Sequence, residues 1–166
     1  MRILVFLHGT TIMHKSAVGV SRLTRVDQVK IQEESVHDYA LYVPVGDAVN
    51  KLTSWKNQGA EILYLSSHKE IENVEKDKQV LSKFNFPEGK IYFRKRGQEY
   101  KDIAEAIVPD VLIEDDCESI GGTERMTITF VKPEIKSKIK SIPVKEFGGI
   151  DHLPDKISDL YRDDLR

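Results

Sequence analysis

Two adjacent carboxylates, Asp115 and Asp116, follow the apolar run 111–113 after one further acid, Glu114. A strand that ends in adjacent acids is a common way for an α/β protein to hold a hard cation or to handle phosphate. Mg²⁺ prefers one or two carboxylates together with water and substrate phosphate, so this pair suffices for a site. The alternative is a solvated acidic turn in which Asp116 caps the following backbone. Adjacent strand residues point to opposite faces, so at most one of the two acids is expected to face a ligand directly.

An imidazole, His8, follows another apolar run, 2–7, and precedes Gly9. At a strand end it is a candidate general acid, metal ligand or hydrogen-bond donor to phosphate. The alternative is a structural histidine that bonds to a backbone carbonyl. The other histidines lack ligand-like spacing, such as a helical i, i+4 pair with an acid, so a zinc site is not indicated. These are His14, His37, His68 and His152.

Ser66 and Lys101 are candidates for phosphate binding. Ser66 lies between the apolar run 61–65 and a helix. Its hydroxyl and the free amides of that helix form a phosphate cradle, unless Ser66 is a plain N-cap. Lys101 lies near the start of a helix, where the helix dipole disfavours a cation, and this supports a role in balancing phosphate charge. Lys95 is the rival candidate, and solvated surface charge is the alternative for both lysines.

The composition limits the class of protein. The 166 residues suit one domain with a hydrophobic core, and the net charge of −2 gives no general bias toward nucleic acid or anionic membranes. The single cysteine, Cys117, excludes an intramolecular disulfide. No apolar run approaches membrane-spanning length, and the N-terminus lacks the pattern of a secretory signal. We therefore expect a cytoplasmic protein that binds neither nucleic acid nor membrane.

Apolar runs alternate with helical patterns along the chain, which predicts an α/β fold with a Rossmann-like, parallel five-stranded sheet and helices on both faces. Pro143 indicates that the last strand lies at a sheet edge, because proline cannot donate to the ladder. The run 126–131 alternates like a strand. The predicted strands are 2–7, 61–65, 90–93, 111–113 and 141–145. The predicted helices follow the capping residues Ser21 and Asp47, cover 71–84 and 100–107, and close the chain at 153–165.

The order of the strand ends resembles the haloacid dehalogenase-like (HAD) superfamily of hydrolases and phosphotransferases, over about residues 2–144. In that family a strand is followed by Asp-x-Asp-Gly-Thr, a second strand by Ser or Thr, a Lys comes third, and a fourth strand ends in paired acids. The resemblance implies magnesium ligands at Asp115 and Asp116. The phosphate-binding positions that it implies are Gly9, Thr10, Ser66 and Lys101.

The first motif departs from the family pattern at its reacting position. Alignment of Gly9 and Thr10 with the family's Gly-Thr puts Phe6 at the nucleophilic Asp and His8 at the acid/base Asp. Phe6 cannot be phosphorylated and cannot bind magnesium, so the covalent aspartyl-phosphate mechanism is not available through that position. The family pattern uses the backbone carbonyl at the position of His8 as a metal ligand. That carbonyl survives the substitution, so the resemblance still implies a magnesium site, in weakened form.

The resemblance also implies a single domain, 1–166, with a minimal cap. The insert at about 14–45 is too short for a large cap domain and is expected to form a flap. The stretch 123–140 is an elaboration after the fourth motif. The implied function is a pseudoenzyme that binds a small phosphorylated ligand or a protein partner. The alternative is an atypical Mg²⁺-dependent phosphoric-monoester hydrolase, in which His8 acts as acid/base beside the Asp115–Asp116 pair.

Overall fold

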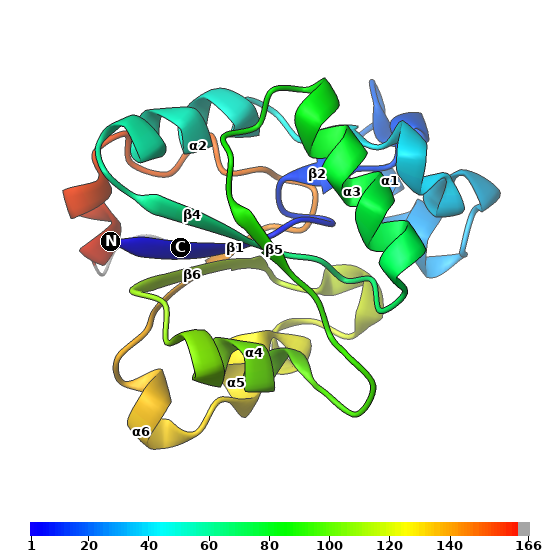
Figure 1. The fold of residues 1–166 in the computed structure, drawn as a ribbon. Coiled ribbons are helices and arrows are strands. Elements are labelled where there is room, and N and C mark those ends of the chain that lie inside the picture. Colours follow the sequence, from blue (N-terminus) through cyan, green and yellow to red (C-terminus); the bar gives the residue numbers. More distant parts are fainter. Residues whose placement is uncertain (163–166) are drawn as a thin grey trace.

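Strand β1 (Arg2–Phe6) is the centre of a five-stranded parallel sheet in the computed structural model, which describes residues 1–162 (Figure 1). The strand order is β5-β4-β1-β6-β7. The chain builds the sheet outward on one side of β1 and then returns to build the other, so the predicted doubly wound α/β fold is confirmed. The other strands are β4 (Glu61–Leu65), β5 (Lys90–Tyr92), β6 (Val111–Asp115) and β7 (Lys140–Val144).

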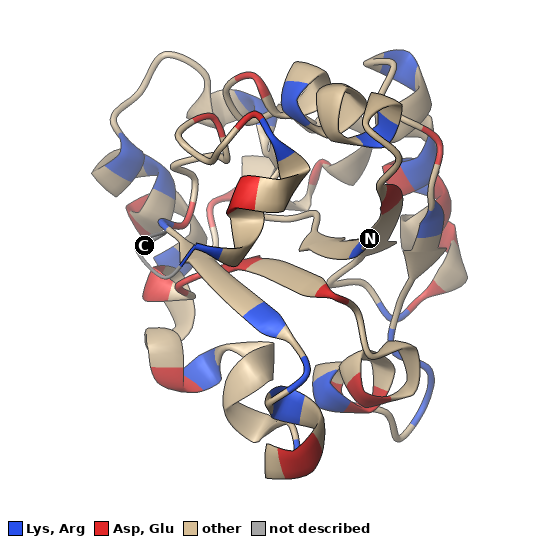
Figure 2. Ribbon diagram, turned by 90° about the vertical axis from the view of Figure 1, so that its left-hand side faces the viewer, with Lys and Arg blue, Asp and Glu red and all other residues tan. Residues whose placement is uncertain are grey.

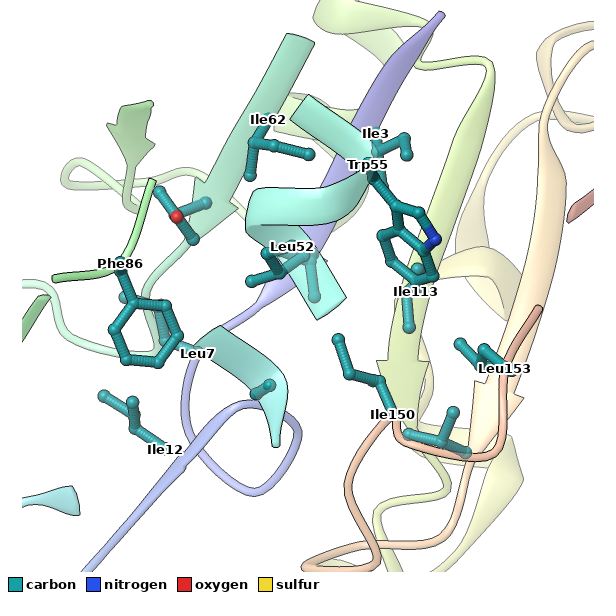
Figure 3. Packing of buried hydrophobic residues seen from close by; sticks show 14 of the residues in the cluster. Ile3, Leu7, Ile12, Leu52, Trp55, Ile62, Phe86, Ile113, Ile150 and Leu153 are labelled. Carbon is teal, nitrogen blue, oxygen red and sulfur yellow. The ribbon is translucent and has the colours of Figure 1, made fainter. Parts of the chain in front are cut away.

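Both faces of β1 are buried, as its continuous apolar run predicts. Ile3 and Val5 pack into the hydrophobic layer that contains Trp55 (Figure 3), whereas Leu4 and Phe6 pack into a second layer on the opposite face. This alternation follows from the two-residue period of a strand. Helices therefore cover the sheet on both sides (Figure 1). They are α1 (Arg22–Lys30), α2 (Ala48–Asn57), α3 (Ile71–Lys83), α4 (Tyr100–Ile107), α5 (Thr127–Phe130) and α6 (Pro133–Lys136).

The insert after β1 is closed by a small antiparallel ribbon of β2 (Ile12–Met13) and β3 (Val43–Pro44). Within the insert, Ser21 accepts a hydrogen bond from the backbone N–H of Thr24 and caps α1, as predicted. The remaining segments of the insert are single 3₁₀ turns. These are η1 (Lys15–Ala17), η2 (Glu34–His37) and η3 (Tyr39–Leu41).

Strand β7 lies at the edge of the sheet, so the edge position predicted from Pro143 is confirmed. Asp47 precedes α2 as predicted, but its side chain does not cap the backbone; it accepts a hydrogen bond from the Asn50 amide instead. Lys and Arg (blue) and Asp and Glu (red) are interspersed along the ribbon in Figure 2, in line with the balanced composition. Among the described residues, no helix has the length and apolar character needed to cross a membrane.

Two predicted elements are wrong. The run 126–131 contains the helical turn α5 and no strand, because the buried carboxylate of Glu114 accepts the amides of Thr127 and Ile128 and fixes them as a helix start. The stretch 153–165 forms only the 3₁₀ helix η6 (Ile157–Tyr161) among its described residues, and 163–165 lie outside them. The indole of Trp55 donates to the Pro154 carbonyl and holds the start of this stretch along α2.

Candidate functional site

A cavity of about 370 Å³ opens at the carboxyl ends of β1, β4 and β6. The insert covers it with Val36, Tyr39 and Tyr42, and the sheet side contributes the strand-end residues. Ligands of open α/β sheets bind at this edge, beside the point where the strand order reverses. The insert predicted as a flap at 14–45 therefore contributes one wall of the candidate site.

Phe6 occupies the end of β1 where the HAD pattern has its nucleophilic acid. Its ring packs edge-on against Tyr100 with the ring centroids 4.9 Å apart, and both rings line the cavity. The position is therefore apolar in its packing as well as in its residue type. The side chain of Phe6 has no carboxylate and cannot form an aspartyl-phosphate.

Asp115 faces the cavity and lies beside the end of β1. Its Oδ2 accepts from the Thr10 hydroxyl at 2.9 Å, and its Oδ1 accepts from the Cys117 amide at 3.0 Å. Burial, with Glu146 as the next largest cause, raises the pKa of Asp115 to about 7. Gly9 has φ of 82°, and a Cβ there would lie 2.9 Å from Asp115 Oδ2. A glycine at this position is what allows the strand end to approach the carboxylate.

Asp116 is not among the residues that line the cavity. Its carboxylate accepts from Lys145 Nζ at 2.9 Å and from the Glu146 amide at 3.1 Å. The two acids therefore separate as expected from strand alternation. Glu146, which the sequence analysis did not single out, lines the cavity instead. The sequence signal that could have identified Glu146 is its position just beyond the strand β7. Burial raises its pKa, and Ser119 donates two hydrogen bonds to its carboxylate.

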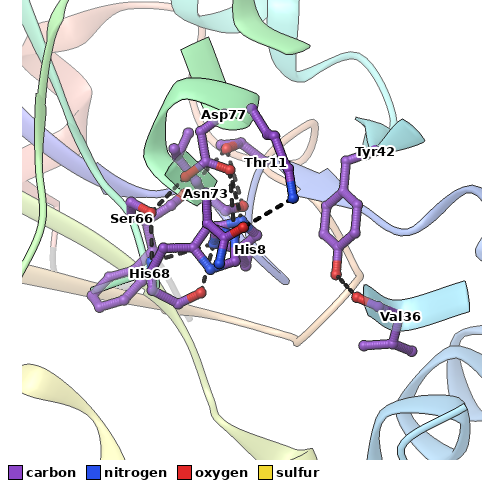
Figure 4. A network of polar contacts seen from close by, with 12 residues as sticks. His8, Thr11, Val36, Tyr42, Ser66, His68, Asn73 and Asp77 are labelled. Carbon is purple, nitrogen blue, oxygen red and sulfur yellow. Dashed lines mark hydrogen bonds and ion pairs between the residues drawn. The ribbon is translucent and has the colours of Figure 1, made fainter. Parts of the chain in front are cut away.

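His8 lies in a chain of polar contacts that the sequence did not predict (Figure 4). Its Nε2 is 3.0 Å from Oδ1 of the buried Asp77 on α3, and its Nδ1 is 2.8 Å from the Ser67 hydroxyl. Ser66 is fully buried and donates to Asp77 Oδ2 at 2.5 Å, while it accepts from the His68 amide. Ser66 therefore orients Asp77, and Ser67 is the serine that lines the cavity.

His68 packs against this chain. Its Nε2 makes no hydrogen bond and lies 3.7 Å from Asp77 Oδ1. Burial, and then the neighbouring His8, lower the pKa of His68 to about 4, so its imidazole is neutral at neutral pH. Two histidines and one aspartate thus lie together at the cavity wall, although His8 is distant in the sequence from His68 and Asp77. Their ligand atoms all lie within 4.8 Å of one another.

Lys101 and Lys95 are not among the residues that line the cavity. The ammonium group of Lys101 is half-exposed and pairs with Glu99 Oε2 at 3.1 Å. Arg125 is the cationic residue in the cavity lining, and Arg94 lies behind that lining, over the Tyr100 ring. The structure therefore brings His8, Gly9 and Asp115 together at the cavity and leaves Lys101 outside it.

The substitution Asp115→Asn is expected to become more stabilising as the pH rises. A folded-state pKa of about 7 lies above the ordinary value for Asp, so the folded state binds this proton more tightly than the unfolded state, and stability falls as the pH rises from about 4 to 7. Asn cannot ionise. Urea unfolding measures the free energy of unfolding of the variant minus that of the wild type. This difference should be larger at pH 8 than at pH 5 by on the order of 2 kcal/mol.

The matched control is Asp38→Asn, at an exposed aspartate of the insert. Its stability relative to the wild type should change little over the same pH range. A constant difference between Asp115→Asn and the wild type at both pH values would contradict the raised pKa of Asp115.

Comparison with known proteins supports the fold. A class C acid phosphatase from Bacillus anthracis, solved with tungstate bound, matches with a TM-score of 0.55 and 13% identity over 89% of this chain and 68% of that one. A chain of the Pnkp1/Rnl/Hen1 RNA repair complex matches with a TM-score of 0.51 and 12% identity over 87% of this chain and 43% of that one. The present chain therefore spans less than half of the latter.

No protein-family model and no curated protein matches this chain. At 12–13% identity the structural likeness shows the fold alone. The class that the structure defines is a Rossmann-like α/β domain with a five-stranded parallel sheet, a fold that it shares with these two structures.

Proposed function

We propose that this chain is a HAD-like domain that has lost the catalytic nucleophile and binds a small phosphorylated ligand in the cavity between the insert and the sheet. The observation that carries the proposal is Phe6, which packs against Tyr100 where the family resemblance expects an acid. The likeness to an acid phosphatase supports a phosphate-related role, and the ring at this position argues against covalent catalysis.

Magnesium fits the acids of this cavity. Asp115 and Glu146 face each other closely enough to raise the pKa of Asp115, and a cation between them would relieve that repulsion. Each Asp115 oxygen accepts one protein hydrogen bond and keeps a lone pair for a metal. Asp115 would hold the ion together with the carbonyl of His8. The ion would supply the positive charge that joins these acids to a ligand phosphate.

The shape and lining of the cavity favour a small molecule over a protein partner. A volume of about 370 Å³ lies within the usual range of small-molecule sites. Arg125 and Gly9 line the cavity, and Arg125 is available for a phosphate oxygen. The buried Thr10 hydroxyl donates to Asp115 Oδ2 beside the metal position. The aromatic rings that line the cavity suit the organic part of the ligand. They belong to Phe6, Tyr39, Tyr42, Tyr100 and Phe147.

A second candidate function is the atypical phosphohydrolase. The observation that favours it is the hydrogen-bonded chain from Ser67 through His8 to Asp77, which orients an imidazole at the cavity wall. In this reading a magnesium ion at Asp115 would activate water, and His8 would move a proton as acid/base. Asp116 would then support the site only through its neighbours, because it pairs with Lys145.

The test is a thermal-shift and turnover assay on the purified chain with Mg²⁺, inorganic phosphate and a panel of phosphate monoesters. Binding without chemistry predicts that Mg²⁺ and phosphate together raise the melting temperature, that Asp115→Asn abolishes the shift, and that no ester is hydrolysed. Asp38→Asn is the matched control and should keep the shift.

Two outcomes would overturn this reading. Turnover that is lost in both His8→Ala and Asp115→Asn would establish the hydrolase instead. No turnover, together with no effect of Mg²⁺ or phosphate on the melting temperature, would exclude the phosphate binder and the hydrolase alike.

A further inference from the structure

His8, His68 and Asp77 converge on one point of the cavity wall from the ends of β1 and β4 and from α3 (Figure 4). We propose that these three side chains bind a divalent transition-metal ion of the zinc class, at a site distinct from the magnesium position at Asp115. The inference does not rest on the proposed function, because Asp115 and Glu146 contribute nothing to it.

The spacing of the ligand atoms fits such an ion. Tetrahedral coordination with bonds of 2.0–2.1 Å places neighbouring ligand atoms roughly 3.3 Å apart. Asp77 Oδ1 lies 3.0 Å from His8 Nε2 and 3.7 Å from His68 Nε2. Both distances fall close to that value, and all three ligand atoms lie within 4.8 Å of one another. Two imidazoles and one carboxylate are also a ligand set that zinc and similar metals prefer.

The environment of His68 is a second observation, independent of the spacing, that points to a bound metal. Its side chain is 9% exposed, and its Nε2 is buried without a hydrogen-bond partner. Buried polar atoms in folded proteins nearly always have a partner, so an unpaired ring nitrogen aimed at a carboxylate needs an explanation. Tyr39 packs on this ring at 4.2 Å and His8 at 4.5 Å, measured between centroids, and they hold it in place.

The groups behind the three side chains are arranged as supports for metal ligands. Ser66 donates to Asp77 Oδ2 and leaves Oδ1 directed at the two histidines. Ser67 Oγ lies 2.8 Å from His8 Nδ1. The Ser67 amide also donates to His8 Nδ1 at 3.3 Å, so Nε2 carries the proton of the neutral ring in this structure. With a metal on Nε2, that proton would move to Nδ1 and be donated to Ser67 Oγ, the Ser67 amide would lose this acceptor, and no net proton would be released. Such partners fix the orientation of ligating side chains.

The fourth coordination position would face the cavity, because His8 and His68 both line it. Three protein ligands with one open position is the arrangement of catalytic zinc sites, in which an oxygen donor from water or a ligand completes the shell. A metal on His8 would also remove this imidazole as a free acid/base. The metal site and the hydrolase reading therefore make opposite predictions for His8.

The test is a titration of the chelator-stripped chain with Zn²⁺ against a chromophoric competitor, with Co²⁺ as a spectroscopic probe. The site predicts one equivalent of tight binding and visible Co²⁺ absorption of the intensity typical of four-coordinate sites. It also predicts a rise in melting temperature with Zn²⁺. Loss of a group that only orients a metal ligand typically costs roughly 10–100-fold in metal affinity. Loss of a ligand itself in His68→Phe should therefore weaken binding by about 100-fold or more.

The phenyl ring of His68→Phe keeps the packing on Tyr39, and circular dichroism would confirm its fold. His152→Ala, at an exposed histidine, is the matched control for adventitious binding and should bind as the wild type does. X-ray absorption at the zinc edge of the wild type gives a readout that needs no variant and should show imidazole ligands. Binding unchanged by His68→Phe, no tight binding in the wild type, or a zinc shell without imidazole would each overturn the proposal.

Discussion

Replacement of Asp77 by alanine is expected to lower the free energy of unfolding by about 3 kcal/mol, because it breaks a buried polar network. The carboxylate is 1% exposed and is the partner of Ser66 through Oδ2 and of His8 through Oδ1. Alanine leaves both of these groups buried without an acceptor, which costs far more than the loss of an exposed pair. Urea unfolding followed by circular dichroism measures the effect.

The matched control is Glu75→Ala, two residues earlier on the same helix. Glu75 is exposed and pairs with the exposed Lys78, so this variant should stay within about 0.5 kcal/mol of the wild type. Asp77→Asn, which keeps the shape and one acceptor, should fall between the two. Equal stabilities of Asp77→Ala and Glu75→Ala would contradict the network as a stabilising feature of the site.

Glu114→Ala should have the second largest effect, a loss of about 2–3 kcal/mol in the free energy of unfolding, since two buried amides lose a carboxylate acceptor. Glu114 is 2% exposed, and its oxygens accept from the amides of Thr127 and Ile128 at 2.7 and 3.0 Å. Without that carboxylate, the first turn of α5 loses its hydrogen bonds to the end of β6 and keeps the apolar contacts of Ile128. Urea unfolding gives the stability, and limited proteolysis within 118–131 reports the release of this segment.

Glu124→Ala removes an exposed acid from the same segment and serves as its control. It should leave both the stability and the cleavage pattern unchanged. Cleavage within 118–131 that is no faster in Glu114→Ala than in Glu124→Ala would show that α5 is held by its apolar contacts alone.

Residue types alone predicted most of the sheet. The run from Arg2 to Leu7 is apolar without interruption and therefore suits a strand covered on both faces, which is where β1 lies. Pro143 marked β7 as an edge strand, because a missing backbone donor is tolerated only there. These predictions succeeded because they depend on local backbone chemistry and on burial.

The candidate site was predicted only in part. Strand ends pointed correctly to the edge of the sheet where His8 and Asp115 line the cavity. Asp77 escaped notice because it lies mid-helix among charged residues, and only the packing of α3 directs it inward. The strand predicted at 126–131 was wrong for the same reason, because it depends on a tertiary contact. The Glu114 carboxylate at the end of β6 accepts hydrogen bonds from two amides of this run.

Residue type and local periodicity alone predicted the doubly wound sheet, the edge at which polar strand-end residues collect, and the absence of an acid at Phe6. Which polar groups share a site was set by the packing of the folded chain. It turned Asp115 toward the cavity and Asp116 toward Lys145, and it brought His68 and Asp77 to His8. These contacts depend on how a helix packs against a strand, and no short stretch of sequence encodes that packing.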